Sequence, residues 1–245
     1  MDFLGAGIAW LTDAAQWSGA EGIPNRIWEH VLISGIPLIA ALLVAVPVGL
    51  YIGHTGRGAL FAVSLGNIGR ALPSLGILGI VLPLTLPLTA GTDIPLGLPP
   101  TLVALFALAI PPIVTNAYVG LREIDRDLVE AGRGMGMRES QLLTQVELPL
   151  ALPVILAGVR TSAVQVVATA TLGAVLGIGG LGRYILDGIS QNDDGQLVGG
   201  ALLVALLAII TELIFAGLQR ASVSRGLQPQ RRAFELAGQA PGPPA

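Results

Sequence analysis

The sequence predicts an all-α membrane protein, a polytopic bundle of about five transmembrane helices. Hydrophobic residues make up 53% of the 245 residues and charged residues only 12%, whereas about a quarter of a typical soluble domain is charged. The mean hydropathy is +0.75. Several apolar runs also reach about 20 residues, the length that crosses the hydrocarbon core of a bilayer. One membrane domain within a lipid bilayer is therefore expected.

The apolar runs predict where the chain crosses the membrane. A short segment before them, residues 3–17, carries Trp10 and Trp17 and is expected to lie at the interface. Residues 1–20 contain Asp2 and Asp13 but no basic residue, so a secretory signal peptide is not expected. The five predicted crossings are residues 31–52, 71–90, 98–119, 150–178 and 197–217.

The second crossing is the least regular, because the apolar stretch 59–90 is too long for one straight span. Arg70 lies inside it, and an arginine at the bilayer centre costs several kcal/mol. We expect residues 59–69 to lie along the cytoplasmic side or within the bundle, with Arg70 near the headgroups. The span also contains Pro73, Pro83 and Pro87, which is typical of a helix beside a solute pathway but also of ordinary helix irregularity.

Arginine placement predicts the orientation, since short cytoplasmic loops are enriched in basic residues. The segment 120–149 and the tail after residue 217 each contain four arginines, so both are expected to be cytoplasmic. Counting back places residues 1–26 outside the cell, before the transmembrane domain of residues 27–220. The tail, residues 221–245, is expected to be cytoplasmic, and its part from Gln228, rich in Pro, Gly, Gln and Ala, largely disordered.

Between the third and fourth crossings lies a charged segment with two helical patches, residues 127–133 and 138–147. We call residues 127–147 the elbow. Three glycines interrupt it, and Gly136 is the natural position for a positive φ angle. Leu142, Leu143 and Val146 recur at helical spacing, so the second patch is amphipathic. Such an elbow either caps the bundle or meets a soluble partner.

The spacing of the elbow resembles the "EAA" loop of binding-protein-dependent ABC importer permeases. Gly136 follows Glu130 by six residues, Val146 by sixteen and Leu148-Pro149 by eighteen and nineteen. The resemblance implies a type I importer (MetI-like) fold, with residues 121–149 as the coupling loop that inserts into a separate ATPase subunit. Gly132 and Val146 depart from the family pattern but keep its small or apolar character. The implied coupling residues are Glu130, Ala131, Gly132, Gly136, Val146, Leu148 and Pro149.

The resemblance extends over about residues 27–220 and is greatest to permeases for glycine betaine, carnitine and choline. It is carried by RALPSLGILGIVLPL, PPIVTNAYVGL, VELPLALPVILAGVRTSAV and GAVLGIGGLGRYI. The implied partners are the ATPase subunit, an extracytoplasmic substrate-binding protein and a second permease copy or paralogue. An amino acid such as methionine is the alternative substrate. An ATPase-independent secondary transporter is disfavoured, because internal repeats and buried ionisable groups are lacking.

A permease for a small solute needs polar side chains on bundle-facing positions of apolar helices. Ser162, Gln165 and Thr169 share one helical face by their spacing. Hydrogen bonding between helices is the alternative role for such side chains. Glu212, inside the last span, is expected to pair with Arg160 or Arg70, or to extend to the interface. The candidate path residues are Ser74, Asn116, Tyr118, Thr161, Ser162, Gln165 and Thr169.

Other functions are disfavoured by the composition. The chain has no cysteine and only two histidines, so neither a metal site nor a cofactor is expected. The net charge of −3 and the lack of a basic stripe argue against nucleic acid binding. No G-x-x-x-x-G-K-[ST] motif occurs, so ATP hydrolysis is not expected of this chain. The glycine-rich GIGGLG at 177–182 is expected to form an extracytoplasmic turn or a short re-entrant segment.

The predicted orientation is testable with single cysteines, because the chain contributes no thiol of its own. A cysteine at Asp93 or Asp194 should react with an impermeant thiol reagent added to intact cells, and one at Ser140 should react only after the membrane is opened. Labelling of position 140 from outside would invert the orientation.

Overall fold

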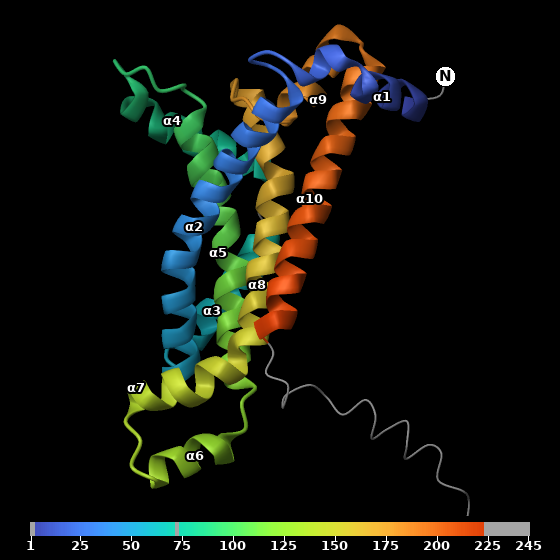
Figure 1. The fold of residues 1–245 in the computed structure, drawn as a ribbon. Helices are drawn as coiled ribbons and strands as arrows, with labels where there is room; N and C mark the ends of the chain where they lie inside the picture. The colour runs from blue at the N-terminus through green and yellow to red at the C-terminus, as the bar shows by residue number, and fades with distance from the viewer. Residues whose placement is uncertain (1–2, 72–73, 223–245) are drawn as a thin grey trace, which may run out of the picture.

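The computed structural model describes residues 3–71 and 74–222. The regular secondary structure of this part is all helical, with turns and short loops between the helices. Four long helices run side by side (Figure 1). At one end of this bundle lies the elbow, and at the opposite end lie the N-terminal helix and a short helix that precedes the last long one. The predicted fold class is confirmed.

The four long helices correspond to the first, third, fourth and fifth predicted crossings. They are α2 (Ile23–Thr55), α5 (Leu98–Arg122), α8 (Leu148–Thr169) and α10 (Asp194–Ser222). A 3₁₀ segment, η3 (Ala170–Leu176), continues α8. In the described part of the chain, these four are long and apolar enough to cross a membrane. At 1.5 Å per residue, the 33 residues of α2 extend about 50 Å, well beyond the roughly 30 Å hydrocarbon core.

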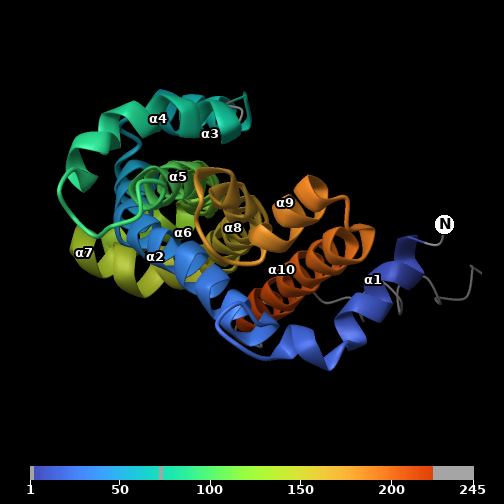
Figure 2. The same ribbon diagram turned by 90° about the horizontal axis from the view of Figure 1, so that it is seen from above.

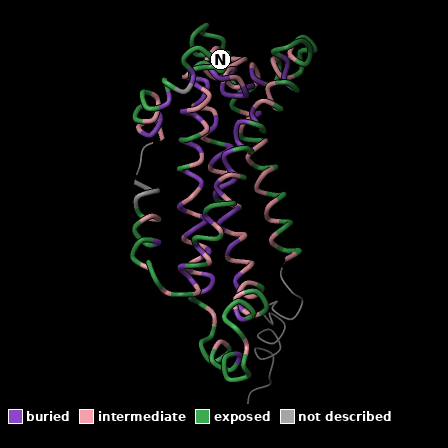
Figure 3. Tube along the Cα trace, turned by 90° about the vertical axis from the view of Figure 1, so that its left-hand side faces the viewer, coloured by how far each residue is buried: buried purple, intermediate pink, exposed green. Residues whose placement is uncertain are grey.

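The second crossing differs from the single span predicted for residues 71–90. Two helices, α3 (Ala59–Ala71) and α4 (Ser74–Thr89), follow one another along α5 (Figures 1 and 3). Thr115 of α5 donates a hydrogen bond to the Ala62 carbonyl of α3 (3.4 Å), so α3 packs at one side of the bundle, beside α5 (Figure 2). Most of its described side chains remain exposed. The Arg70 side chain and Pro73 lie outside the described residues, as does the tail from residue 223.

The end of the bundle opposite the elbow is closed by short helices. The predicted interfacial segment 3–17 forms α1 (Phe3–Thr12) and the 3₁₀ turn η1 (Ala14–Trp17). They separate at Asp13, whose carboxylate accepts a hydrogen bond from the backbone N–H of Ala15. Trp10 contacts Tyr184 of α9 (Gly182–Gln191) edge to face, with ring centroids 4.9 Å apart. Burial raises the pKa of Tyr184 to about 12, so its hydroxyl stays neutral and donates to the Glu21 carbonyl.

The GIGGLG segment forms a tight turn between η3 and α9, at the same end. Gly177 and Gly180 have φ angles of 79° and 85°, which favour glycine. The Gly180 N–H donates to the Glu29 carboxylate (2.8 Å). The Leu181 N–H donates to Nδ1 of His30 (3.3 Å), while Nε2 of His30 lies 2.9 Å from the Val167 carbonyl. His30 is thus satisfied as a neutral ring by one backbone donor and one backbone acceptor.

The elbow itself consists of three short helical segments. They are α6 (Arg126–Gly134), α7 (Glu139–Gln141) and η2 (Leu142–Glu147). The last is a π-helix, and its hydrogen bonds span five residues, as from the Leu148 N–H to the Leu143 carbonyl. It leads without interruption into α8. The predicted patches at 127–133 and 138–147 are therefore both helical.

The core forms where α2 and α5 approach each other through small residues. Ala41, Ala45, Gly49 and Gly53 recur every four residues along α2, and all are buried. A Cβ atom added at Gly49 would lie 2.5 Å from the Cβ of Ala117, and one at Gly53 would lie 2.8 Å from that of Leu121. Small residues permit such close helix contacts in membranes. Val159, Ala163 and Val166 of α8 complete this core.

The last helix, α10, is exposed or half-buried along most of its length (Figure 3), and its buried residues are Gly199, Gly200 and Leu203. In the C-terminal half of α10, Glu212 lies 3.3 Å from Nε of Arg160 on α8. The predicted pairing of Glu212 with Arg160 is thus confirmed.

The close contact at Gly49 gives a stability prediction. Gly49→Ala should lower the free energy of unfolding by about 1–3 kcal/mol, because the added methyl group meets Ala117. Gly35→Ala in the same helix is the control, since nothing lies within 4 Å of a Cβ at that position. Thermal melting in detergent would measure both. Equal melting temperatures would show that the α2–α5 contact adjusts without cost.

Candidate functional site

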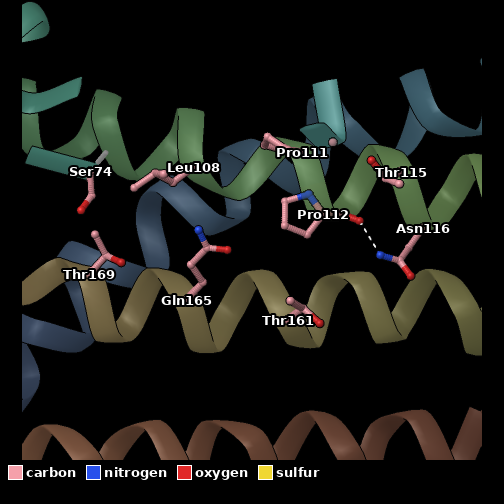
Figure 4. Close-up of a pocket in the computed structure, with 10 residues that line it drawn as sticks. Ser74, Leu108, Pro111, Pro112, Thr115, Asn116, Thr161, Gln165 and Thr169 are labelled. Carbon is pink, nitrogen blue, oxygen red and sulfur yellow. Dashed lines mark hydrogen bonds between the residues drawn. The ribbon is translucent and has the colours of Figure 1, made fainter. Parts of the chain in front are cut away.

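A half-enclosed cavity of about 500 Å³ lies between α3, α4, α5 and α8 (Figure 4). Side chains from α5 and from α8 face each other across it, and Ser74 at the start of α4 closes one end. Five of the seven predicted path residues line this cavity. These are Ser74, Asn116, Thr161, Gln165 and Thr169.

The helical face that α8 presents to the cavity differs by one position from the predicted one. Thr161, Gln165 and Thr169 line the cavity, and they recur every four residues. Ser162 is fully buried and donates a hydrogen bond to the Ala109 carbonyl of α5. Ser162 therefore has the interhelical role that was the alternative for these side chains. Tyr118 packs against the hydrophobic core and is not among the residues that line the cavity.

Other residues that line the cavity were not predicted from the sequence, and most of them belong to α5. They are Gly66, Leu108, Pro111, Pro112 and Thr115. The consecutive prolines were the available signal. Because proline has no N–H, neither Pro111 nor Pro112 can donate a helical hydrogen bond to the carbonyl four residues earlier, so the α5 backbone is less fully paired beside the cavity.

The cavity offers hydrogen-bonding groups without charge. Asn116 donates to the Pro112 carbonyl (2.8 Å), which leaves its own carbonyl oxygen as an acceptor. Thr161 donates to Ala157 of its own helix (3.0 Å). No hydrogen bond within the described part of the chain engages the Gln165 amide. Among the described residues that line the cavity, none is charged or aromatic.

The elbow turns through a Schellman motif at Gly136. The Met137 N–H donates to the Gly132 carbonyl (3.1 Å), and the Gly136 N–H donates to the Arg133 carbonyl (2.9 Å). Gly136 has a φ angle of 83°, as predicted, and this conformation ends α6. Nothing in the described chain lies within 4 Å of a Cβ at Gly136, so a side chain there would point outward.

The predicted coupling residues differ in exposure. Glu130, Ala131, Gly136 and Pro149 are exposed, whereas Val146 and Leu148 are half-buried. Gly132 is buried, and a Cβ there would lie 3.3 Å from both Leu142 and Met137. The exposed residues are thus available to a partner, while Gly132 allows the two halves of the elbow to pack together and Leu148 packs against the cluster that contains Ala117 and Leu121 of α5.

An ion-pair network connects the elbow to the end of α2. Arg133 of α6 donates to both carboxylate oxygens of Glu139, at 2.9 and 3.1 Å. This hydrogen bonding raises the pKa of the Arg133 guanidinium. Nε2 of His54 lies 3.2 Å from the same Glu139 carboxylate, and Nδ1 of His54 contacts the Glu147 carboxylate. Neither His54 nor Glu147 was singled out from the sequence.

Comparisons with known proteins agree with this arrangement. Residues 45–226 match the family described as "Binding-protein-dependent transport system inner membrane component". The chain is 38% identical over 213 residues to the choline transport system permease protein OpuBB of Bacillus subtilis, covering 87% of this chain and 94% of the relative. The glycine betaine/carnitine/choline transport system permease protein OpuCB of the same organism gives the same identity and coverage.

A solved structure shares the fold. A chain of the inward-facing MetNI methionine ABC transporter superposes with a TM-score of 0.67 at 25% identity, covering 80% of this chain and 94% of that one.

Proposed function

Because the chain belongs to the family of binding-protein-dependent transport system inner membrane components, we propose that it forms the membrane path of an ABC importer for a small osmoprotectant of the glycine betaine, choline, carnitine or proline type. The chain is a permease subunit, and ATP hydrolysis belongs to a separate subunit. The observation that carries the proposal is the uncharged polar cavity between α5 and α8, connected to an exposed elbow with the family's spacing.

The substrate class rests on the relatives. The two permeases that are 38% identical to this chain are named for choline and for glycine betaine, carnitine and choline. The methionine transporter is 25% identical, so methionine is the second candidate. The carriage of an osmoprotectant is therefore favoured over that of an amino acid.

The cavity supports conduction rather than capture. Tight binding of a quaternary ammonium requires aromatic faces within about 6 Å of the cation, and no aromatic side chain is among the described residues that line the cavity. Hydroxyl and amide groups from Ser74, Asn116, Thr161, Gln165 and Thr169 replace part of the solute's hydration and release it readily. Capture then belongs to an extracytoplasmic binding protein.

The elbow supports contact with the ATPase subunit. Glu130, Ala131 and Gly136 are exposed on it, and the arginines of segment 120–149 favour a cytoplasmic position for it. The opposite end, with α1, η1 and α9, then lies outside and faces the binding protein. The half-enclosed cavity is completed by a second permease copy or paralogue, which closes its open side.

Conduction without capture predicts weak solute binding. The permease assembled with its ATPase, but without the binding protein, should show no glycine betaine affinity tighter than millimolar, which corresponds to about −4 kcal/mol. Uptake into proteoliposomes should appear when the binding protein is added. Calorimetry on the assembled complex is the measurement, and a micromolar site in the membrane helices would contradict the proposal.

The exposed turn of the elbow predicts the effect of a charge at Gly136. Gly136→Asp should abolish uptake at unchanged membrane abundance, because the charged side chain points outward into the ATPase contact, where nothing of the described chain lies within 4 Å. Gly136→Asn is the matched control, since asparagine has the same shape, tolerates the positive φ angle of this position and carries no charge. Uptake by the aspartate variant at the rate of the asparagine variant would exclude an electrostatic conflict at this contact.

A further inference from the structure

The two histidines of α2 lie at its opposite ends and in opposite environments. His30 exchanges hydrogen bonds with backbone groups alone. His54, in the last turn of α2, instead faces two carboxylates. Its Nδ1 contacts Glu147 at the end of η2, and its Nε2 lies 3.2 Å from Glu139 at the start of α7. The His54 side chain is 13% exposed and that of Glu147 is 7% exposed.

The two contacts of His54 differ in kind. The contact of Nδ1 with Glu147 is a hydrogen bond, and a neutral imidazole makes one such bond through its single N–H. The contact of Nε2 with Glu139 is an approach to 3.2 Å. The hydrogen bond to Glu147 is therefore the directional link between α2 and the elbow.

Glu147 depends on this contact more than Glu139 does. Glu139 is 57% exposed and also pairs with Arg133, and an exposed pair of this kind contributes little to stability. Glu147 is buried, and within the described part of the chain its ion pair is with His54. Arg122, Arg126, Arg133 and Glu130 line the same small hollow. Removing the hydrogen-bond partner of a buried polar group is costly, because that group is left unsatisfied.

The contact lies between the elbow and the tightest part of the bundle. Gly53, the neighbour of His54, packs against Leu121 of α5. A Cβ atom added at Gly53 would lie only 2.8 Å from the Cβ of Leu121. Helices α2 and α5 therefore move together at this end. Helix α5 in turn carries Pro112 and Asn116 in the cavity wall. A displacement of the elbow that is transmitted to His54 reaches the cavity through packed atoms.

We propose that His54 is a positioning residue that fastens the elbow to α2 through its hydrogen bond to the buried Glu147, and that this contact carries movement of the elbow into the bundle. The proposal rests on the proposed function, in which the ATPase moves the elbow. It gives α2 a direct part in coupling, in addition to the continuous path from η2 into α8.

The test combines a transport ratio with a distance. The complete transporter, with ATPase and binding protein, would be reconstituted with His54→Gln or His54→Ala, and the solute imported per ATP hydrolysed would be measured. We expect this ratio to fall about tenfold, within the range of typical coupling between sites, while ATP hydrolysis continues. His54→Arg keeps N–H donors for the Glu147 carboxylate and should restore the ratio.

The distance is measured between spin labels on Arg57→Cys and Thr144→Cys, both exposed positions beside the contact. The chain has no other cysteine. With His54 present, the distance should remain narrow and unchanged when ATP binds. With His54→Ala, it should broaden or shift upon ATP binding. Glu139→Gln is the control for a surface ion pair and should leave the distance narrow.

The outcomes separate the two proposals. An unchanged ratio together with an unchanged distance in His54→Ala would overturn the role of His54. A lower melting temperature with the ratio and distance unchanged would do the same, since it indicates a structural role alone. If the wild-type complex imports none of the osmoprotectants but the distance responds as expected, the proposed substrate class fails and the role of His54 stands.

Discussion

Helices α2 and α5 lie so close together that Gly49 and Gly53 leave no room for a Cβ atom, and helices α3, α4 and α8 pack on this pair. Helix α8 adds Val159, Ala163 and Val166 to the same core, and its next face forms one wall of the cavity. Helices α3 and α4 lie against α5 and form another wall. In a bilayer, where lipid is as apolar as the helices, such close contacts are a main source of helix association.

The two ends of α2 are fixed by different chemistry. At one end, Glu29 and His30 bind backbone groups of the GIGGLG turn and of α8. These bonds tie the turn to the bundle without involving a net charge on His30. At the other end, the polar partners of the His54 ring in the described part of the chain are carboxylates of the elbow. A change in the charge of the elbow therefore acts directly on this end of α2.

Much of the fold was predictable from the sequence, but helix rotation was not. The long apolar runs and the glycines of the elbow carry strong signals, and Gly136 adopts the expected positive φ angle. Whether Thr161 or Ser162 lines the cavity depends on how α8 is rotated about its own axis. Hydrophobic periodicity does not reveal this rotation, because a membrane helix is apolar on its lipid face as well as on its core face. The contact of His54 with Glu147 joins residues 93 apart in the sequence and leaves no local signal.

The π-helix η2 has a mechanical consequence for the join between the elbow and α8. A π-turn accommodates one residue more than an α-turn. Rewinding Leu142–Glu147 as an α-helix would thus turn the elbow by about 100° around the axis of α8, the rotation of one residue. The core residues of α8 would keep their places during this change. The π-helix therefore sets the direction in which the elbow leaves α8, and with it the side of the helix on which Glu147 meets His54.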